Sequence, residues 1–274
     1  PGDDLNEIIY NAAGEHPFVL GIEGVHEQAI QLQKKYHAHW SGLPMNISIV
    51  GMTPDAEIRG LAWHGYHGGL VDSLEVHDLA IRTAKGWRSP VWDTQPAERV
   101  VMNNVGLLPD LTPGAGYDGM KWGFKIADGT DVLIIQDCRR LEDPLTGLRA
   151  KFWEHWGYFT NVMEAYIVGN DISGGNRTGF QFRTPGFDGF QHPTGPLLIE
   201  GNKCNEYGWE WGFMNGGSAI TVWESRGPLV IRDNEVVKPK YGACKVTHQP
   251  ADQKPWTVSE EGHCHEDVIL ENNH

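Results

Sequence analysis

The sequence lacks several features that would each point to a class of protein. No apolar run approaches the roughly 18 residues that a membrane-spanning helix needs, so we expect no membrane span. No cluster of Lys and Arg exceeds three residues and the net charge is −14, so a nucleic acid would be repelled rather than bound. The chain also has no phosphate-binding loop, nucleophile elbow or zinc signature.

Long helical patterns are also scarce. Only residues 3–13 have apolar residues at helical spacing, following an Asp that can cap the first turn. Without helices between the strands, a βαβ fold is not expected. The sequence therefore predicts one short helix followed by an all-β region.

What the chain does have is one repeated phrase, in which a few aliphatic residues and two linking residues precede an Asn or Asp. The six copies end at Asn104, Asp137, Asn170, Asn202, Asn234 and Asn272, at intervals of 33, 33, 32, 32 and 38 residues. Residues 47–51 and 74–78 fit the same template. A regular interval of this length with one short strand per repeat is typical of a stacked solenoid.

The segments between the phrases support the same prediction. Residues 123–128, 179–184, 219–224 and 243–248 alternate apolar and polar side chains, as a strand with one buried face does. An Asn at a tight corner tolerates a left-handed backbone, and its amide can bond the Asn of the next repeat. We therefore expect these Asn and Asp residues to form a stacked ladder.

This phrase and its ladder resemble those of the right-handed parallel β-helix, the pectate-lyase-like superfamily. The resemblance implies a β-helix over residues 18–274, with residues 1–17 as an N-terminal cap that covers the open end of the core. The last repeat ends at His274, where a further turn would be expected, so we expect the sequence to be the front part of a longer protein.

Cysteine is infrequent, with four residues in 274. The four are too scattered for a disulfide framework. Cys204 and Cys244 stand where other repeats place inward-pointing aliphatic residues, which favours buried free thiols. A pairing of Cys138 with Cys264 is left open.

Aligning the repeats brings chemically active residues together on one sheet face. The ends of the first strands present Asp72, Asp93, Asp128 and Glu224 at one corner, with Glu154 and His155 in the same region. The same alternation directs polar and aromatic side chains outward; they include Lys125, Trp153, Gln181, Arg183, Trp223 and Lys245. His248 lies at the end of the last of these strands. Trp beside carboxylates is a common way to hold sugar rings.

The leading hypothesis is a secreted glycoside hydrolase, extracellular or periplasmic, that cleaves a polysaccharide lying along this sheet. Residues one repeat apart lie about 5 Å apart, close to the carboxyl separation of retaining glycosidases. Asp128 and Glu154 would be that pair, and His155 would adjust their protonation. Arg183 would contact the substrate as a further catalytic residue. The substrate would be bound by Lys125, Glu224, Lys245 and His248, with Trp153 and Trp223 stacking on its rings, and no cofactor is required.

Two alternatives remain open. A calcium-dependent polysaccharide lyase would use Ca²⁺ held by Asp72, Asp93 and Asp128, because stacked carboxylates suit that ion. Hydrolysis is preferred because a chain of charge −14 attracts polyanions poorly. The second alternative is a non-catalytic, glycan-binding or adhesin-type β-helix. The sequence does not specify the sugar or the oligomeric state.

Overall fold

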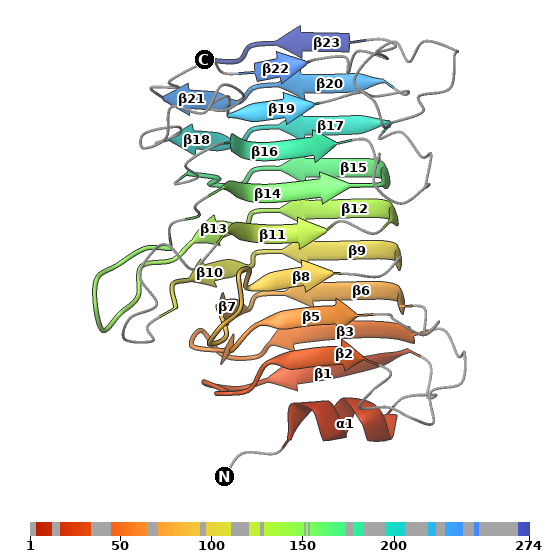
Figure 1. Ribbon diagram of the computed structural model, residues 1–274, viewed down its shortest axis with the longest axis vertical. Helices are drawn as coiled ribbons and strands as arrows, with labels where there is room; N and C mark the ends of the chain where they lie inside the picture. Colours follow the sequence, from red (N-terminus) through yellow and green to blue (C-terminus); the bar gives the residue numbers. More distant parts are fainter. Residues whose placement is uncertain are drawn as a thin grey trace.

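The computed structural model describes residues 4–12, 17–33, 45–64, 71–93, 97–110, 121–126, 129–150, 152, 154–173, 178–183, 195–205, 219–222, 228–237, 244–246 and 268–274. Within these ranges the fold is three parallel sheets and one helix (Figure 1). No helix among these residues is long and apolar enough to cross a membrane. The predicted all-β fold is confirmed.

Sheet A carries the aliphatic phrases. Its strands, in spatial order, are β1 (Phe18–Ile22), β3 (Met45–Gly51), β6 (Val71–His77), β9 (Ala97–Asn103), β12 (Thr130–Gln136), β15 (Val162–Val168), β17 (Leu197–Glu200), β20 (Leu229–Arg232) and β23 (Val268–Glu271).

Sheet B is narrow and has a four-stranded and a two-stranded part. Isolated β-bridges from Asp171 to Arg139 and to Lys203 join the two parts. Its strands are β4 (Glu57–Ile58), β7 (Ala80–Arg82), β10 (Gly106–Leu108), β13 (Arg139–Arg140), β18 (Lys203–Asn205) and β21 (Glu235–Val237).

Sheet C contains the strands with alternating apolar and polar residues. They are β2 (Ile30–Gln33), β5 (Leu61–His64), β8 (Val91–Asp93), β11 (Trp122–Ile126), β14 (His155–Thr160), β16 (Thr178–Arg183), β19 (Ile220–Val222) and β22 (Cys244–Val246). The chain visits the sheets in rotation, for example from β6 to β7 to β8 and back to sheet A at β9 (Figure 1).

The three sheets enclose one core. In sheet A, Leu133 and Ile135 point inward and pair in register with Val100 and Met102 of the preceding repeat, and all four are buried. Phe124, Phe159 and Phe180 contribute from sheet C. Stacking repeats therefore buries a continuous apolar column that no single repeat could bury alone.

At the corner between sheets A and B, one residue has the left-handed backbone of the turn and the next residue forms the ladder between repeats. The first position has a left-handed backbone, with φ between 48° and 68°, at Asp78, Asn104, Asp137, Gly169, Gly201, Asp233 and Asn272. The next position points inward, where the side-chain amides of Asn170 and Asn202 each donate to the Oδ1 of the following ladder Asn at 2.9 Å. Asn234 donates likewise to Asn273 at 2.9 Å.

The expected ladder therefore needs a correction. Asn104, Asp137 and Asn272 occupy the left-handed position, not the buried ladder, although the Asn104 amide donates to Asp78 of the preceding repeat at 2.6 Å. In the earlier repeats the ladder position holds Leu79, Val105 and Cys138, all buried. The sequence pattern mixed the two positions because Asn and Asp suit both of them.

The predicted helix forms as α1 (Leu5–Ala12) and lies at the end of the stack beside β1 and β2 (Figure 1). Asp4 caps it, accepting bonds from the backbone of Asn6 and Glu7 at 3.0 and 3.3 Å. Leu5 and Ile9 are buried in the core cluster. The Asn6 side chain bonds the backbone of β2, accepting from Gln31 N at 2.8 Å, so it satisfies part of that edge strand.

Candidate functional site

One register-aligned column runs along the outer face of sheet C. Its members pair strand by strand, in the order Gln31, Ala62, Trp92, Lys125, Tyr158, Gln181 and Thr221, and it continues to the backbone position of Lys245. Polar, basic and aromatic side chains predominate in it. The predicted outward positions of Lys125 and Gln181 are thus in one line.

Aromatic rings and cations meet at the middle of this column. The Lys125 ammonium lies 5.0 Å from the ring centroid of Trp92 and 5.6 Å from that of Trp122. Tyr158 lies beside Trp122, with ring centroids 6.1 Å apart, and stacks on His155 at 5.6 Å. These five residues, Trp92, Trp122, Lys125, His155 and Tyr158, are called the aromatic cluster below.

A carboxylate borders the aromatic cluster. Glu154 directly precedes β14, and its carboxylate lies 3.5 Å from the ammonium of Lys121. The backbone N–H groups of Glu154 and His155 both donate to the Lys121 carbonyl, at 2.9 and 3.2 Å, which fixes this segment to the preceding repeat. Lys121 also lies 5.4 Å from the Trp122 ring, so the ion pair and the aromatic cluster adjoin.

Trp122 and His155 reach this face where the strand alternation is irregular, since Trp122 is only two residues from the inward Phe124. They pair in register, and Trp156 after His155 turns inward, where it is fully buried between Phe124 and Phe180. At the matching position of β11 stands Gly123, where an added Cβ would lie 2.6 Å from the Trp156 carbonyl oxygen. His155, itself 3% exposed, stacks on Tyr158 beside this close contact.

The proposed carboxylate corner is not assembled as the alignment predicts. Asp72 lies in β6 of sheet A, whereas Asp93 ends β8 of sheet C. The residue in register with Asp93 one repeat earlier is Trp63. Asp93 is fully buried, as is Trp63, with which it pairs.

Several predicted site residues lie outside the described ranges, namely Asp128, Trp153, Trp223, Glu224 and His248. The backbones of Arg183 and Lys245 are described, and they pair with Thr160 and Thr221. Within the described ranges, no group of three or more His, Cys, Asp or Glu residues could hold a metal ion. The structure thus brings Lys125, Glu154 and His155 together and separates Asp72 from Asp93.

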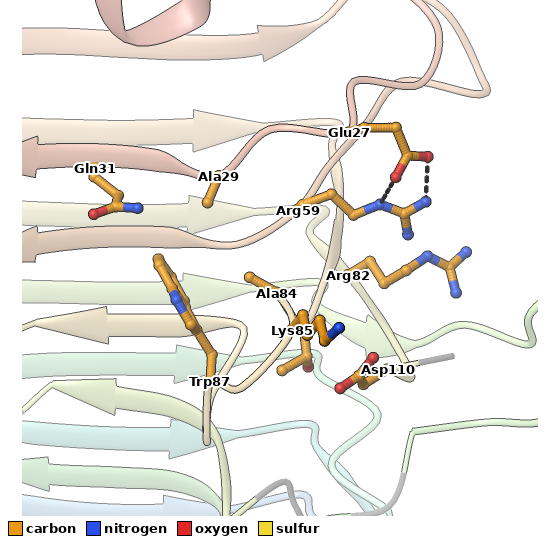
Figure 2. A pocket seen from close by; sticks show the side chains of 10 residues that line it. Glu27, Ala29, Gln31, Arg59, Arg82, Ala84, Lys85, Trp87 and Asp110 are labelled. Carbon is orange, nitrogen blue, oxygen red and sulfur yellow. Dashed lines mark hydrogen bonds and ion pairs between the residues drawn. The ribbon is translucent and has the colours of Figure 1, made fainter. Parts of the chain in front are cut away.

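A cavity of about 520 Å³ adjoins the N-terminal end of the column. It lies where sheet B passes into sheet C and shares Gln31 with the column. Figure 2 shows Trp87 and Gln31 on one side, and Arg59, Arg82, Lys85 and Asp110 on the other. Ala29 and Ala84 lie between these two sides, and Glu27 and Thr83 also line the cavity.

Ion pairs make the wall of this cavity rigid. The buried Arg82 guanidinium donates to Glu57 at 2.6 Å and to Asp143 at 2.6 Å. Burial opposes the charge of Arg82, but the hydrogen bonds to Glu57 and Asp143 outweigh it and raise the pKa of Arg82. Arg59 holds Glu27 in a two-point contact, and this hydrogen bonding lowers the pKa of Glu27.

Sequence reasoning did not single out Trp92, Trp122, Tyr158 or Lys121. One signal was available: Trp92 and Tyr158 lie in register with Lys125 on the two neighbouring strands of sheet C, β8 and β14. The charged cavity wall had no comparable signal, because Arg82 and Asp143 are 61 residues apart.

Comparisons with family models, curated proteins and solved structures find no match. The arrangement of residues on this face therefore carries any functional argument.

Proposed function

We propose that the fold is a right-handed parallel β-helix of the pectate-lyase-like kind, with α1 as its N-terminal cap. Three parallel sheets visited in rotation and a stacked Asn ladder support this proposal. Right-handed winding is expected because parallel crossover connections are nearly always right-handed. Burial of Leu5 and Ile9 beneath the first repeat supports the role of α1.

On that fold, the function best supported is a secreted carbohydrate-active protein that binds a polysaccharide along the outer face of sheet C. The observation that carries this is the aromatic cluster, set in a line of polar side chains. Aromatic faces bind the apolar faces of sugar rings, and Lys125 and Gln181 offer donors to sugar hydroxyls. The cavity at Trp87 would continue the same binding surface past Gln31.

Hydrolysis of a glycosidic bond is the proposed reaction. Glu154 as the acid would donate a proton to the glycosidic oxygen as its bond to the anomeric carbon breaks. Asp128 would act as the second carboxylate, accepting the proton of the attacking water or, in a retaining reaction, attacking first. Lys121, 3.5 Å from Glu154, would orient that carboxyl group, and His155 would shape its surroundings.

A matched set of variants tests binding and turnover separately. We expect Trp122→Ala to weaken oligosaccharide binding about tenfold through lost stacking, an effect of about 1.4 kcal/mol. Tyr166→Ala is the control, since Tyr166 is an outward aromatic on sheet A. Glu154→Gln should abolish release of reducing ends from the polysaccharide while binding is retained.

Binding without turnover is the second candidate, because the ion pair with Lys121 already occupies the Glu154 carboxylate. If the wild-type chain bound glycans of a broad panel but released no reducing ends from them, the result would favour binding without turnover. Products with ultraviolet absorbance whose formation stops on chelation would instead identify a calcium-dependent lyase. If Trp122→Ala and Tyr166→Ala reduced binding equally, the result would contradict binding at the outer face of sheet C.

A further inference from the structure

The cavity that Gln31 shares with the column of sheet C is built by the segments that lead from sheet B to sheet C. Arg59 lies between β4 and β5, and Asp110 follows β10. Lys85 and Trp87 both lie between β7 and β8. Because β4, β7 and β10 pair in parallel, the segments that follow them come side by side at one end of the sheet C face (Figure 2).

The Trp87 ring is held in a fixed position at this cavity. The turn that carries it is closed by a hydrogen bond from the Trp87 N–H to the Ala84 carbonyl at 2.9 Å. Gly86 within the turn has a φ of 80°, which glycine adopts without strain. The six-membered part of the indole lies against Gly60, where an added Cβ would be 2.9 Å from ring carbon Cζ3. The half-buried ring therefore offers a ligand a fixed aromatic surface.

The charges around the cavity nearly cancel. Three cations and four carboxylates line the cavity or bond to its lining: Arg59, Arg82, Lys85, Glu27, Glu57, Asp110 and Asp143. The two arginines are paired with three of these carboxylates. An anionic ligand would therefore meet no excess of positive charge, in a chain whose net charge is −14. The balance favours a neutral ligand.

The polar groups of the cavity suit the hydroxyl groups of such a ligand. Lys85 is exposed, and within the described part of the chain no hydrogen bond or ion pair holds its ammonium. That ammonium can donate to ligand oxygens, and the Asp110 carboxylate on the same side of the cavity can accept from a hydroxyl (Figure 2). A sugar ring has an apolar face for Trp87 and hydroxyls at its edge for these two groups. The volume of about 520 Å³ lies within the usual range of ligand pockets.

We propose that this cavity is a subsite for a neutral sugar unit at one end of the polysaccharide-binding face. The inference rests on the proposed function, because the bound oligosaccharide would continue along the column from Gln31 to Lys125. These two residues are three strands apart, about 14 Å, so one oligosaccharide can reach both Trp87 and the aromatic cluster. Its end unit would stack on Trp87 and bond Lys85 and Asp110 through its hydroxyls.

Isothermal titration calorimetry with neutral hexasaccharides tests this proposal. The probes are hexasaccharides of glucose, of mannose and of xylose, and the one that the wild-type chain binds most tightly is used for the variants. The wild-type chain should bind one hexasaccharide, because a single molecule occupies both places. Trp87→Ala and Trp122→Ala should each weaken this binding about tenfold through lost stacking.

Two lysine variants form a matched pair. Lys85→Met and Lys203→Met each remove one positive charge from an exposed lysine, but Lys203 lies in β18 and does not line the cavity. Lys85→Met should weaken hexasaccharide binding about fivefold through lost hydrogen bonds, and Lys203→Met should leave it unchanged. Because Lys85 is exposed, Lys85→Met decides the test if circular dichroism shows that Trp87→Ala does not fold.

The outcomes distinguish a failure of this inference from a failure of the proposed function. If Trp122→Ala weakened binding while Trp87→Ala and Lys85→Met left it unchanged, the cavity would not be a subsite, although the binding face would stand. If the wild-type chain bound none of the neutral hexasaccharides, or if none of these variants weakened binding, both proposals would fail. Tighter binding of a galacturonic acid hexasaccharide than of every neutral one would overturn the assignment of a neutral ligand.

Discussion

The side-chain amide of Asn202 donates to the Oδ1 of Asn234 at 2.9 Å, although the two residues are 32 positions apart. The same amide donates to the carbonyl of Ile167 at 2.9 Å, while its Oδ1 accepts from the backbone and side chain of Asn170. Every polar atom of this buried side chain is thus used to join successive repeats.

Replacing Asn202 with Ala should therefore be strongly destabilising. It leaves the Asn170 N–H and the Ile167 carbonyl buried without these partners, at about 1–3 kcal/mol for each group. We expect the free energy of unfolding to fall by about 4 kcal/mol in a urea titration. Asn103→Ala, on the outer face of sheet A, should change it by less than about 0.5 kcal/mol. Equal effects of the two variants would contradict the role assigned to the ladder.

The buried Arg82–Asp143 pair gives a second prediction. Asp143→Asn keeps the side-chain size but removes the charge from the 2.6 Å contact with Arg82, so unfolding should become easier by about 3 kcal/mol. The adjacent Glu142→Gln affects an exposed pair at 3.6 Å from Arg149 and should cost less than about 1 kcal/mol. Thermal unfolding of both variants at neutral pH measures the difference, and a similar loss in both would argue against the pair.

The same carboxylate makes stability depend on pH in the acid range. Burial raises the pKa of Asp143, but hydrogen bonds from Arg82 and Thr146 outweigh burial and lower it from 3.8. Its contribution is fully present above 3.8, and is lost as pH falls from there through the lowered folded pKa. Below pH 4, the wild-type chain should lose stability more steeply than Asp143→Asn in denaturant titrations. If the wild-type chain and Asp143→Asn lost stability equally as the pH fell, Asp143 would not be the source of this pH dependence.

The thiols should differ in reactivity. Burial raises the pKa of Cys138 to about 12 and that of Cys244 to about 11. Because the thiolate is the reactive form, Cys138 should resist alkylation in the folded chain and react about a thousandfold faster after unfolding. Peptide mapping after timed alkylation should detect labelled Cys244 before labelled Cys138. Labelling of Cys138 at the rate of the unfolded chain would disprove its burial.

The corner between sheets A and B shows how far the sequence could be interpreted. The repeat length and the inward aliphatic residues are encoded locally, so the parallel sheets could be predicted. Which residue of each corner has the left-handed backbone could not, because Asp233 and Asn234 satisfy one motif equally well. Only stacking in three dimensions assigns Asp233 to the turn and Asn234 to the ladder.

The candidate site was predictable to a similar extent. Strand alternation placed Lys125 on the outer face, and proximity in sequence placed Glu154 next to His155. Segments of different length between strands displaced the alignment of Asp72, which lies in sheet A instead of beside Asp93. The contact of Tyr158 with Trp122 depends on side-chain packing between repeats, and no local pattern specifies it.

By itself, the sequence determined an all-β chain of short parallel strands, because apolar periodicity and corner residues act within each repeat. The tertiary structure decided which side chains meet: Arg82 with Asp143, Lys125 with Trp92, and Asn202 with Asn234. These contacts depend on the lengths of the intervening segments and on the register between neighbouring strands. Both are settled only when the whole stack buries its core.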